Sequence, residues 1–129
     1  MSRKSKGMNV ERELIHLFWG DNWAAVRVAG SGSMKYPCPD ILAGNSSRKL
    51  AIECKATKSK YQYLSKDEIH QLKSFAVLFG AEPWIGLRFN NEDWRFMELN
   101  ALKETTKNFT ASLETAKKYG KSFSQLLSL

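Results

Sequence analysis

Hydrophobic residues near the start of the chain repeat with the period of a helix. Four of them keep the i, i+4, i+7, i+8 spacing of one helical face: Val10, Leu14, Leu17 and Phe18. Gly20 ends this pattern. Residues 1–7 are basic and hold no apolar anchor, which predicts a mobile basic arm before the helix.

Three short apolar runs follow, and each is bounded by turn-forming residues. Residues 23–29 are apolar with β-branched side chains and predict a strand, and the short runs 39–43 and 48–55 predict two more. Residues 30–37 contain two glycines and a proline and predict a flexible loop. Residues 44–47 (GNSS) have turn composition, so the second and third strands are expected to form a hairpin.

The second half of the chain predicts a helix and two more strands. Ser65 and Glu68 form the S-x-x-E capping box of a helix that Gly80 would end. Its expected core positions are Leu72, Phe75, Ala76 and Phe79. Residues 84–89 and 94–99 are predicted strands, and the stretch before Ser65, with Tyr61 and Tyr63, is expected to be a polar connection. Residues 100–129 are weakly patterned, with a last helix over 123–129.

The order of these elements predicts the fold class. One helix, three strands, one helix and two strands indicate a single α/β domain over residues 1–129, with a mixed five-stranded sheet flanked by helices. The length allows one hydrophobic core and no separate regulatory domain.

Composition limits the classes of function. Twenty Lys and Arg against 13 Asp and Glu give a net charge of +7, which favours a polyanionic partner. No apolar stretch is long enough for a membrane span, and the amino terminus has no secretory signal, so we expect a cytoplasmic protein without membrane contact. Cys38 and Cys54 lack the spacing of a sulfur metal site and are expected to be free thiols.

The hairpin carries the candidate chemistry. If Ser46 and Ser47 form its turn, Asp40 lies directly opposite Glu53, with Cβ atoms about 4.5–5.5 Å apart. Lys55 points to the same face, because side chains alternate along a strand. A register shift of one residue would move Asp40 to the other face, so this prediction depends on the pairing.

Two carboxylates and an ammonium in this arrangement suit metal-dependent hydrolysis. Hard carboxylate oxygens bind Mg²⁺, and the bound ion lowers the pKa of water and stabilises negative charge on a phosphate. Lys55 would orient or deprotonate the attacking water, or stabilise the developing charge, and these roles stay open. The alternative is a solvated surface cluster. Five residues argue against it, because they make both strands apolar on both faces: Ile41, Leu42, Leu50, Ala51 and Ile52.

Five motifs in chain order carry a resemblance to a known family. They are Glu11-Arg12-Glu13, Val26–Ser33, Pro39-Asp40-Ile41, Ile52-Glu53-Cys54-Lys55 and Trp94-Arg95-Phe96. Together they resemble the archaeal Holliday junction resolvases, which belong to the PD-(D/E)xK nuclease superfamily. The resemblance runs from about Lys6 to Leu99 and implies a restriction-endonuclease-like fold.

The resemblance also implies an activity and a set of site residues. It implies a homodimeric endonuclease that resolves four-way DNA junctions in recombination and repair, with Mg²⁺, or Mn²⁺ in its place. The catalytic residues implied are Glu11, Ser31, Asp40, Glu53 and Lys55, of which Glu11, Asp40 and Glu53 would hold the metal directly or through water. Arg12 and Arg27 would contact DNA. Phe75 and Phe79 would lie near the dimer interface.

Other basic residues are candidates for phosphate contacts by position. Arg3, Lys4, Lys6 and Lys35 would gather with Arg12 and Arg27 near the active face if the loop folds over it.

Two other functions compete with junction resolution. One is a superfamily nuclease acting on duplex DNA, although no substrate-reading module is visible. The other is a non-catalytic basic protein, although such a surface has little reason to hold three carboxylates.

Overall fold

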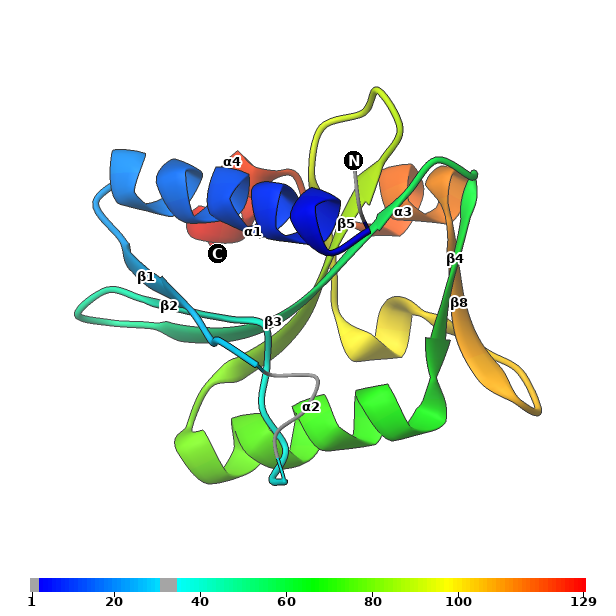
Figure 1. The fold of residues 1–129 in the computed structure, drawn as a ribbon, viewed down its shortest axis with the longest axis horizontal. Coiled ribbons are helices and arrows are strands. Elements are labelled where there is room, and N and C mark those ends of the chain that lie inside the picture. Colours follow the sequence, from blue (N-terminus) through cyan, green and yellow to red (C-terminus); the bar gives the residue numbers. More distant parts are fainter. Residues whose placement is uncertain (1–2, 31–34) are drawn as a thin grey trace.

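A five-stranded mixed sheet forms the centre of the computed structural model, which describes residues 3–30 and 35–129 and the side chains from residue 9 onward (Figure 1). The sheet order is β1-β2-β3-β5-β6, and its pairs are antiparallel except for the parallel pair β3–β5. Its strands are β1 (Ala24–Arg27), β2 (Ile41–Gly44), β3 (Lys49–Thr57), β5 (Glu82–Phe89) and β6 (Arg95–Met97). These are the five strands that the hydrophobic pattern predicts, in the predicted fold class.

Helices cover both faces of this sheet. Helix α1 (Arg3–Gly20) and the short α4 (Phe123–Leu127) pack on one face, where Leu50 and Ile52 of β3 join their core. Helix α2 (Lys66–Phe79) packs on the other face, where Ala51 contributes to a second core. Alternate residues of β3 therefore enter different cores, which explains why the strand is apolar on both faces.

Helix α2 begins and ends where its sequence predicts. Ser65 Oγ accepts a hydrogen bond from the Glu68 amide at 3.0 Å, and Glu68 Oε1 accepts one from the Ser65 amide at 3.0 Å, which completes the capping box. Gly80 ends the helix with a φ of 79°, a left-handed conformation that favours glycine. Leu72 and Ala76 are buried as expected, whereas Phe79 is 46% exposed.

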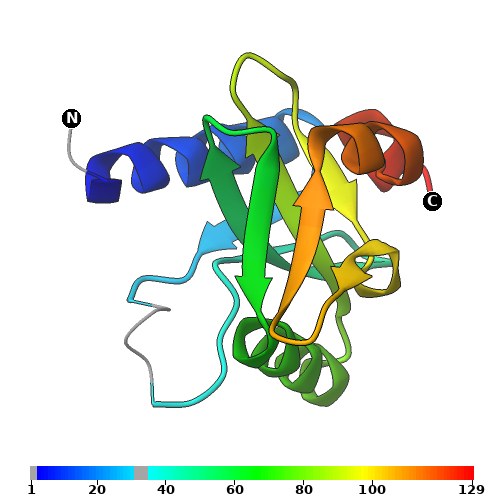
Figure 2. The same ribbon diagram turned by 90° about the vertical axis from the view of Figure 1, so that its right-hand side faces the viewer.

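A second, three-stranded sheet was not predicted. Its order is β4-β8-β7, formed by β4 (Tyr61–Ser65), β7 (Lys103–Glu104) and β8 (Asn108–Ser112), and it faces the viewer in Figure 2. The expectation of a polar connection at Tyr61 and Tyr63 is therefore wrong. Both tyrosines are exposed while Leu64 is buried, so this strand has too few apolar residues to be recognised before its partner is known.

The carboxyl-terminal segment holds more structure than its weak pattern indicates. Besides β7 and β8 it contains a 3₁₀ turn (Leu99–Ala101) and α3 (Leu113–Tyr119), and α4 ends at Leu127. The segment closes onto the main sheet through mutual backbone hydrogen bonds between Phe96 and Lys121. It is thus an integral part of the domain.

The amino-terminal helix begins earlier than predicted. Helix α1 starts at Arg3, so residues 3–7 extend the helix and do not form a separate arm. Adding a turn to an existing helix avoids the cost of a new nucleus, and Arg3, Lys4 and Lys6 are good helix formers. None of the helices in the described part of the chain is long and apolar enough to cross a membrane.

Gly86 of β5 lies where two aromatic residues and an isoleucine meet. A Cβ atom there would lie 3.2 Å from Ile52 Cγ2, 3.2 Å from Trp94 Cζ3 and 3.3 Å from Phe96 Cε1. We predict that Gly86→Ala lowers the free energy of unfolding by about 1–3 kcal/mol, because the core is overpacked. Chemical denaturation at fixed protein concentration measures this change.

Gly20 provides the matched control for this substitution. No atom lies within 4 Å of a Cβ placed there, so Gly20→Ala should be neutral or stabilise by about 0.4–1 kcal/mol. Equal stability of Gly86→Ala and the wild type would contradict tight packing of Ile52, Trp94 and Phe96 around Gly86.

Candidate active site

The β2–β3 hairpin has the register that aligns the two candidate carboxylates. Ile41 pairs with Ile52 and Gly44 with Lys49, so Asp40, just before β2, lies opposite Glu53. Its backbone amide donates to the Ile52 carbonyl at 3.1 Å, which is one residue out of the register of the strand pair and ties Asp40 to β3 just before β2 begins. Its side-chain Oδ2 accepts a hydrogen bond from the Cys54 amide at 2.9 Å, which holds the carboxylate against β3.

Glu53 is the strongly perturbed acid of this pair. Burial in the sheet and the adjacent charge of Asp40 raise its pKa from 4.5 to about 8, although Lys55 acts in the opposite direction. Two carboxylates this close repel each other when both are ionised. The pair therefore holds a proton near neutral pH, or attracts a cation that replaces it.

Lys55 faces α2 and is held there by Glu68. The Lys55 ammonium forms an ion pair with Glu68 Oε2, and both side chains are about one third exposed or less, at 26% and 33%. Burial disfavours the charged lysine, but the hydrogen bond and charge of Glu68, together with Glu53 and Asp40, outweigh it and raise the pKa of Lys55. Lys55 is therefore an ammonium at neutral pH.

Glu11 reaches the cluster from helix α1. Its Oε1 lies 3.2 Å from Arg27 Nε on β1, although that N–H is not aligned for a hydrogen bond. Burial and the charge of Asp40 raise the pKa of Glu11 and outweigh the effect of Arg27. Glu11 is thus within electrostatic reach of Asp40 while its charge is partly balanced by Arg27.

This arrangement suits a divalent cation held mainly by two carboxylates. Burial and the charge of Asp40 raise the pKa of Glu53, and two carboxylates of this kind supply the hard oxygen ligands that suit Mg²⁺. No group of three or more Asp, Glu, His or Cys side chains comes close enough for a three-residue metal site in the part of the chain described. The pairing of Glu11 with Arg27 explains why it does not close onto the other two.

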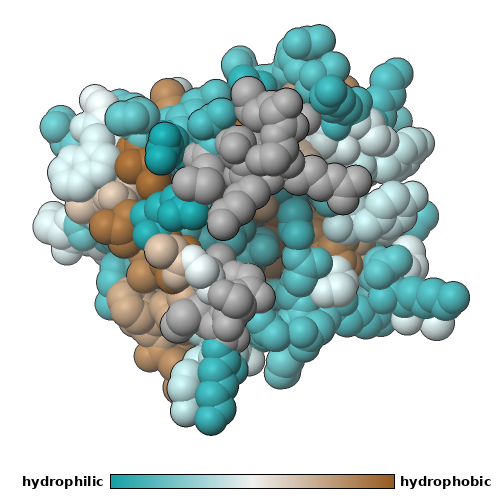
Figure 3. Space-filling view, in the orientation of Figure 1, coloured by the Kyte–Doolittle hydropathy of each residue, from teal (hydrophilic) through white to brown (hydrophobic). Residues whose placement is uncertain are grey.

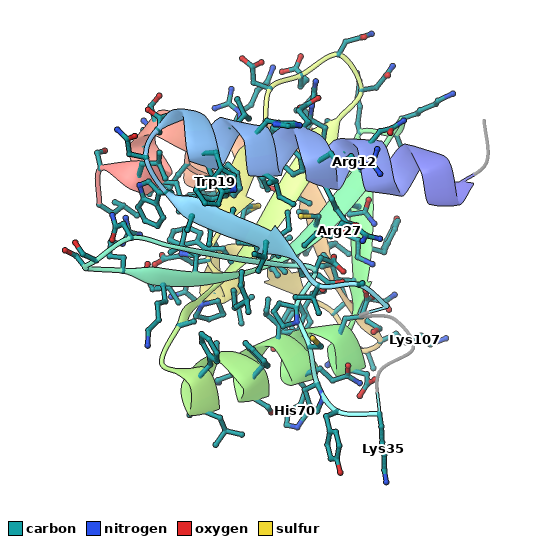
Figure 4. The ribbon with its side chains drawn as sticks, turned by 60° about the vertical axis from the view of Figure 1, so that its left-hand side comes forward. Arg12, Trp19, Arg27, Lys35, His70 and Lys107 are labelled. Carbon is teal, nitrogen blue, oxygen red and sulfur yellow. The ribbon has the colours of Figure 1, made fainter. Side chains whose placement is uncertain are left out.

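The predicted DNA contacts separate into two regions. Figure 4 places Arg12 on α1 and Arg27 on β1 on the same side of the molecule, whereas Lys35 lies beyond α2 at the other end. Arg12 and Lys35 are exposed, and Arg27 is half-buried. Ser31 and the side chains of Arg3, Lys4 and Lys6 lie outside the described part of the structure.

Glu68 was not predicted as a site residue. The capping box already accounts for a glutamate at this position. No sequence pattern indicated a contact with Lys55, 13 positions earlier. The contact depends on α2 packing over the face of β3 that carries Lys55.

The chain is similar to known proteins over almost its full length. Residues 2–128 match the family described as archaeal Holliday junction resolvase (Hjc). It is 45% identical over 129 residues, 95% of each chain, to a protein of Archaeoglobus fulgidus named crossover junction endodeoxyribonuclease Hjc. A protein of the same name from Sulfolobus acidocaldarius is 33% identical over 98% of this chain and 90% of its own length.

A solved structure supports the same grouping. The structure of Archaeoglobus fulgidus Hjc, described as a Holliday junction resolvase from an archaeal hyperthermophile, superimposes with a TM-score of 0.88. The match covers 93% of this chain and 97% of the other, at 41% identity. The second sheet and α3 therefore belong to a fold that this relative shares.

The raised pKa of Glu53 predicts a pH-dependent stability. Between pH 4.5 and about 8 the folded protein holds a proton on Glu53 that the unfolded chain has released. The free energy of unfolding of the metal-free protein should therefore fall as the pH rises through this window. Glu53→Gln removes this component, so its stability relative to the wild type should increase from pH 5 to pH 8.

Denaturant unfolding with a chelator present, at several pH values, measures this difference. The comparison between the two proteins cancels the titration of distant groups. A stability difference that stays constant from pH 5 to pH 8 would contradict the raised pKa.

Proposed function

Because the chain belongs to the family of archaeal Holliday junction resolvases, we propose that the cluster of Asp40, Glu53 and Lys55 is its active site. The protein is an endodeoxyribonuclease that acts on Holliday junctions, the four-way DNA intermediates of recombination and repair. The observation that carries the proposed site is the register of β2 and β3, which sets Asp40 opposite Glu53 in a sheet covered on both faces.

The two hairpin carboxylates bind the metal ion in this proposal. Asp40 and Glu53 would supply its oxygen ligands, and Glu11, whose carboxylate is paired with Arg27, would contribute directly or through water. The ion would be Mg²⁺, with Mn²⁺ as a substitute. A bound divalent cation lowers the pKa of water and stabilises charge on the phosphate.

Lys55 supplies positive charge beside the scissile phosphate. Its raised pKa makes the side chain an ammonium in the metal-free protein. An ammonium here can orient the attacking water through its N–H donors and stabilise the negative charge of the transition state. Ser31 remains a proposed catalytic residue on the basis of the resemblance alone.

Basic residues along the rim of the site would hold the DNA backbone. Arg12 is exposed on α1, and Arg27 lies between α1 and the hairpin. Arg3, Lys4 and Lys6 continue the first helix toward its amino end, on the α1 side of the site. Contacts of this kind fix the position of a junction without reading its base sequence.

A second copy of the chain would cover an apolar surface beside the site. A groove of about 230 Å³ is lined by Ala24 and Val26 of β1, Leu42 of β2 and Phe79 of α2. Val26 and Phe79 are 57% and 46% exposed, and the surface is visible as a brown area where β1 and the end of α2 lie (Figure 3). Phe75 stacks on Phe79 with ring centroids 5.2 Å apart.

A two-fold dimer formed through this surface would bring two active sites to one junction. A junction is resolved by nicks in two opposed strands, and a two-fold dimer supplies two sites in a fixed relation. Other large aromatic residues of the domain, Trp84, Trp94 and Phe96, are buried in the core of the protomer and cannot contribute to such an interface. We therefore assign the interface to Phe75, Phe79 and the adjoining face of β1.

Removal of either hairpin carboxylate should separate cleavage from binding. Asp40→Asn and Glu53→Gln are each expected to abolish cleavage of a four-way junction, because the metal ligands are lost. Junction binding should remain within a few-fold of the wild type, because the basic rim is unchanged. Single-turnover cleavage and gel-shift titration measure the two properties, and near wild-type cleavage by either variant would show that the site is placed wrongly.

Phe79→Glu should convert the dimer to a monomer. A charge placed in the centre of an apolar interface is desolvated without a partner, which costs several kcal/mol. Sedimentation at micromolar concentration should show a dimer for the wild type and a monomer for this variant. Val77→Glu is the matched control, because Val77 is 73% exposed and absent from the groove lining, and should leave the dimer intact. A monomeric wild type would refute the assignment.

A further inference from the structure

Glu68 uses its two carboxylate oxygens for different purposes. Oε1 accepts a hydrogen bond from the Ser65 amide at 3.0 Å, as the capping box of α2 requires. Oε2 forms the ion pair with the Lys55 ammonium on β3. One side chain therefore ties the first turn of α2 to the lysine of the proposed site.

The capping function alone does not require a carboxylate at this position. The other two capping boxes in the described part of the chain use neutral side chains, Thr115 after Ser112 and Gln125 after Ser122. Neither of these residues forms an ion pair, because both lack a charge. The charge of Glu68 thus exceeds what the capping hydrogen bonds require, and it forms the contact with Lys55.

The environment of Lys55 shows why such a contact is needed. The ammonium of Lys55 sits on a flexible side chain. The negative charges of Glu53 and Asp40 also attract it and are among the causes that raise its pKa. An ammonium that folded back onto those two carboxylates would compete with a metal ion for the same oxygens. Glu68 offers a third carboxylate, on α2, that draws the ammonium away from them.

We propose that Glu68 is a positioning residue that fixes the ammonium of Lys55 beside the hairpin carboxylates and keeps it from occupying the place between them. This inference rests on the proposed active site and deepens it. It assigns to the amino end of α2 a role in catalysis in addition to its role in the fold.

Glu68→Gln tests the proposal because it keeps the cap and removes the charge. Glutamine also serves in capping boxes, so α2 should remain capped. With the ammonium misplaced, single-turnover cleavage of a junction should fall by about 10²-fold. The dissociation constant for the junction should stay within about two-fold, because Glu68 is not part of the basic rim.

Asp67→Asn is the matched control. Asp67 also lies in the first turn of α2, is exposed, and accepts a hydrogen bond from Gln71 at 2.8 Å, which asparagine can retain. Both substitutions remove one negative charge from the same helix end and so have similar small effects on stability. Only Glu68→Gln should slow cleavage; an equal loss in both variants would overturn the proposal in favour of a general charge effect.

Two further measurements separate positioning from a structural role. In a double-mutant cycle, Glu68→Gln should slow the wild type but cause no additional loss in Lys55→Ala, because its effect passes through Lys55. Additive losses would overturn the proposal.

The second measurement uses NMR on metal-free protein with ¹⁵N-labelled lysine. Lys55 should give a resolved ammonium signal that broadens or shifts in Glu68→Gln. An unchanged signal would count against the contact.

Asp40→Asn, assayed beside these variants, distinguishes the two levels of inference. If Asp40→Asn is inactive while Glu68→Gln cuts at the wild-type rate, the role of Glu68 is refuted and the active site stands. If Asp40→Asn remains active, the active site itself is wrong and the proposed role of Glu68 fails with it.

Discussion

The antiparallel register of β2 and β3 is the constraint on which the site depends. It aligns Asp40 with Glu53 and directs Lys55 to the face that α2 covers. A slip of one residue would exchange the two faces of a strand that contributes to both cores, so packing of Leu50, Ala51 and Ile52 enforces the register. The same hydrophobic contacts that fold the protein therefore hold two carboxylates together.

The site holds two neighbouring carboxylates that do not stabilise the fold. Burial, and after it the charge of Asp40, raise the pKa of Glu53 to about 8, which destabilises the ionised, metal-free protein. Two ion pairs, Arg27 with Glu11 and Lys55 with Glu68, enclose this pair from α1 and α2. The electrostatic strain is thus localised at the point where a cation and a phosphate would relieve it, which is common at catalytic centres.

Local patterns predicted the parts of the molecule whose residues are close in sequence or strongly apolar. These include the five strands of the main sheet, the capping box of α2 and the opposition of Asp40 and Glu53. Strand β4 escaped detection because Tyr61 and Tyr63 are exposed, and it is stabilised by pairing with β8, some 45 residues later. Glu68 escaped for the same reason, since its contact with Lys55 exists only after α2 has packed on the sheet.

The most direct test of the central claim compares two substrates with and without metal. The wild-type protein is incubated with a synthetic four-way junction and with a linear duplex of the same sequence, each in Mg²⁺ or in chelator. We expect paired nicks in the junction that require Mg²⁺, and little cleavage of the duplex under either condition. Cleavage in chelator, or equal cleavage of junction and duplex, would contradict a metal-dependent junction resolvase.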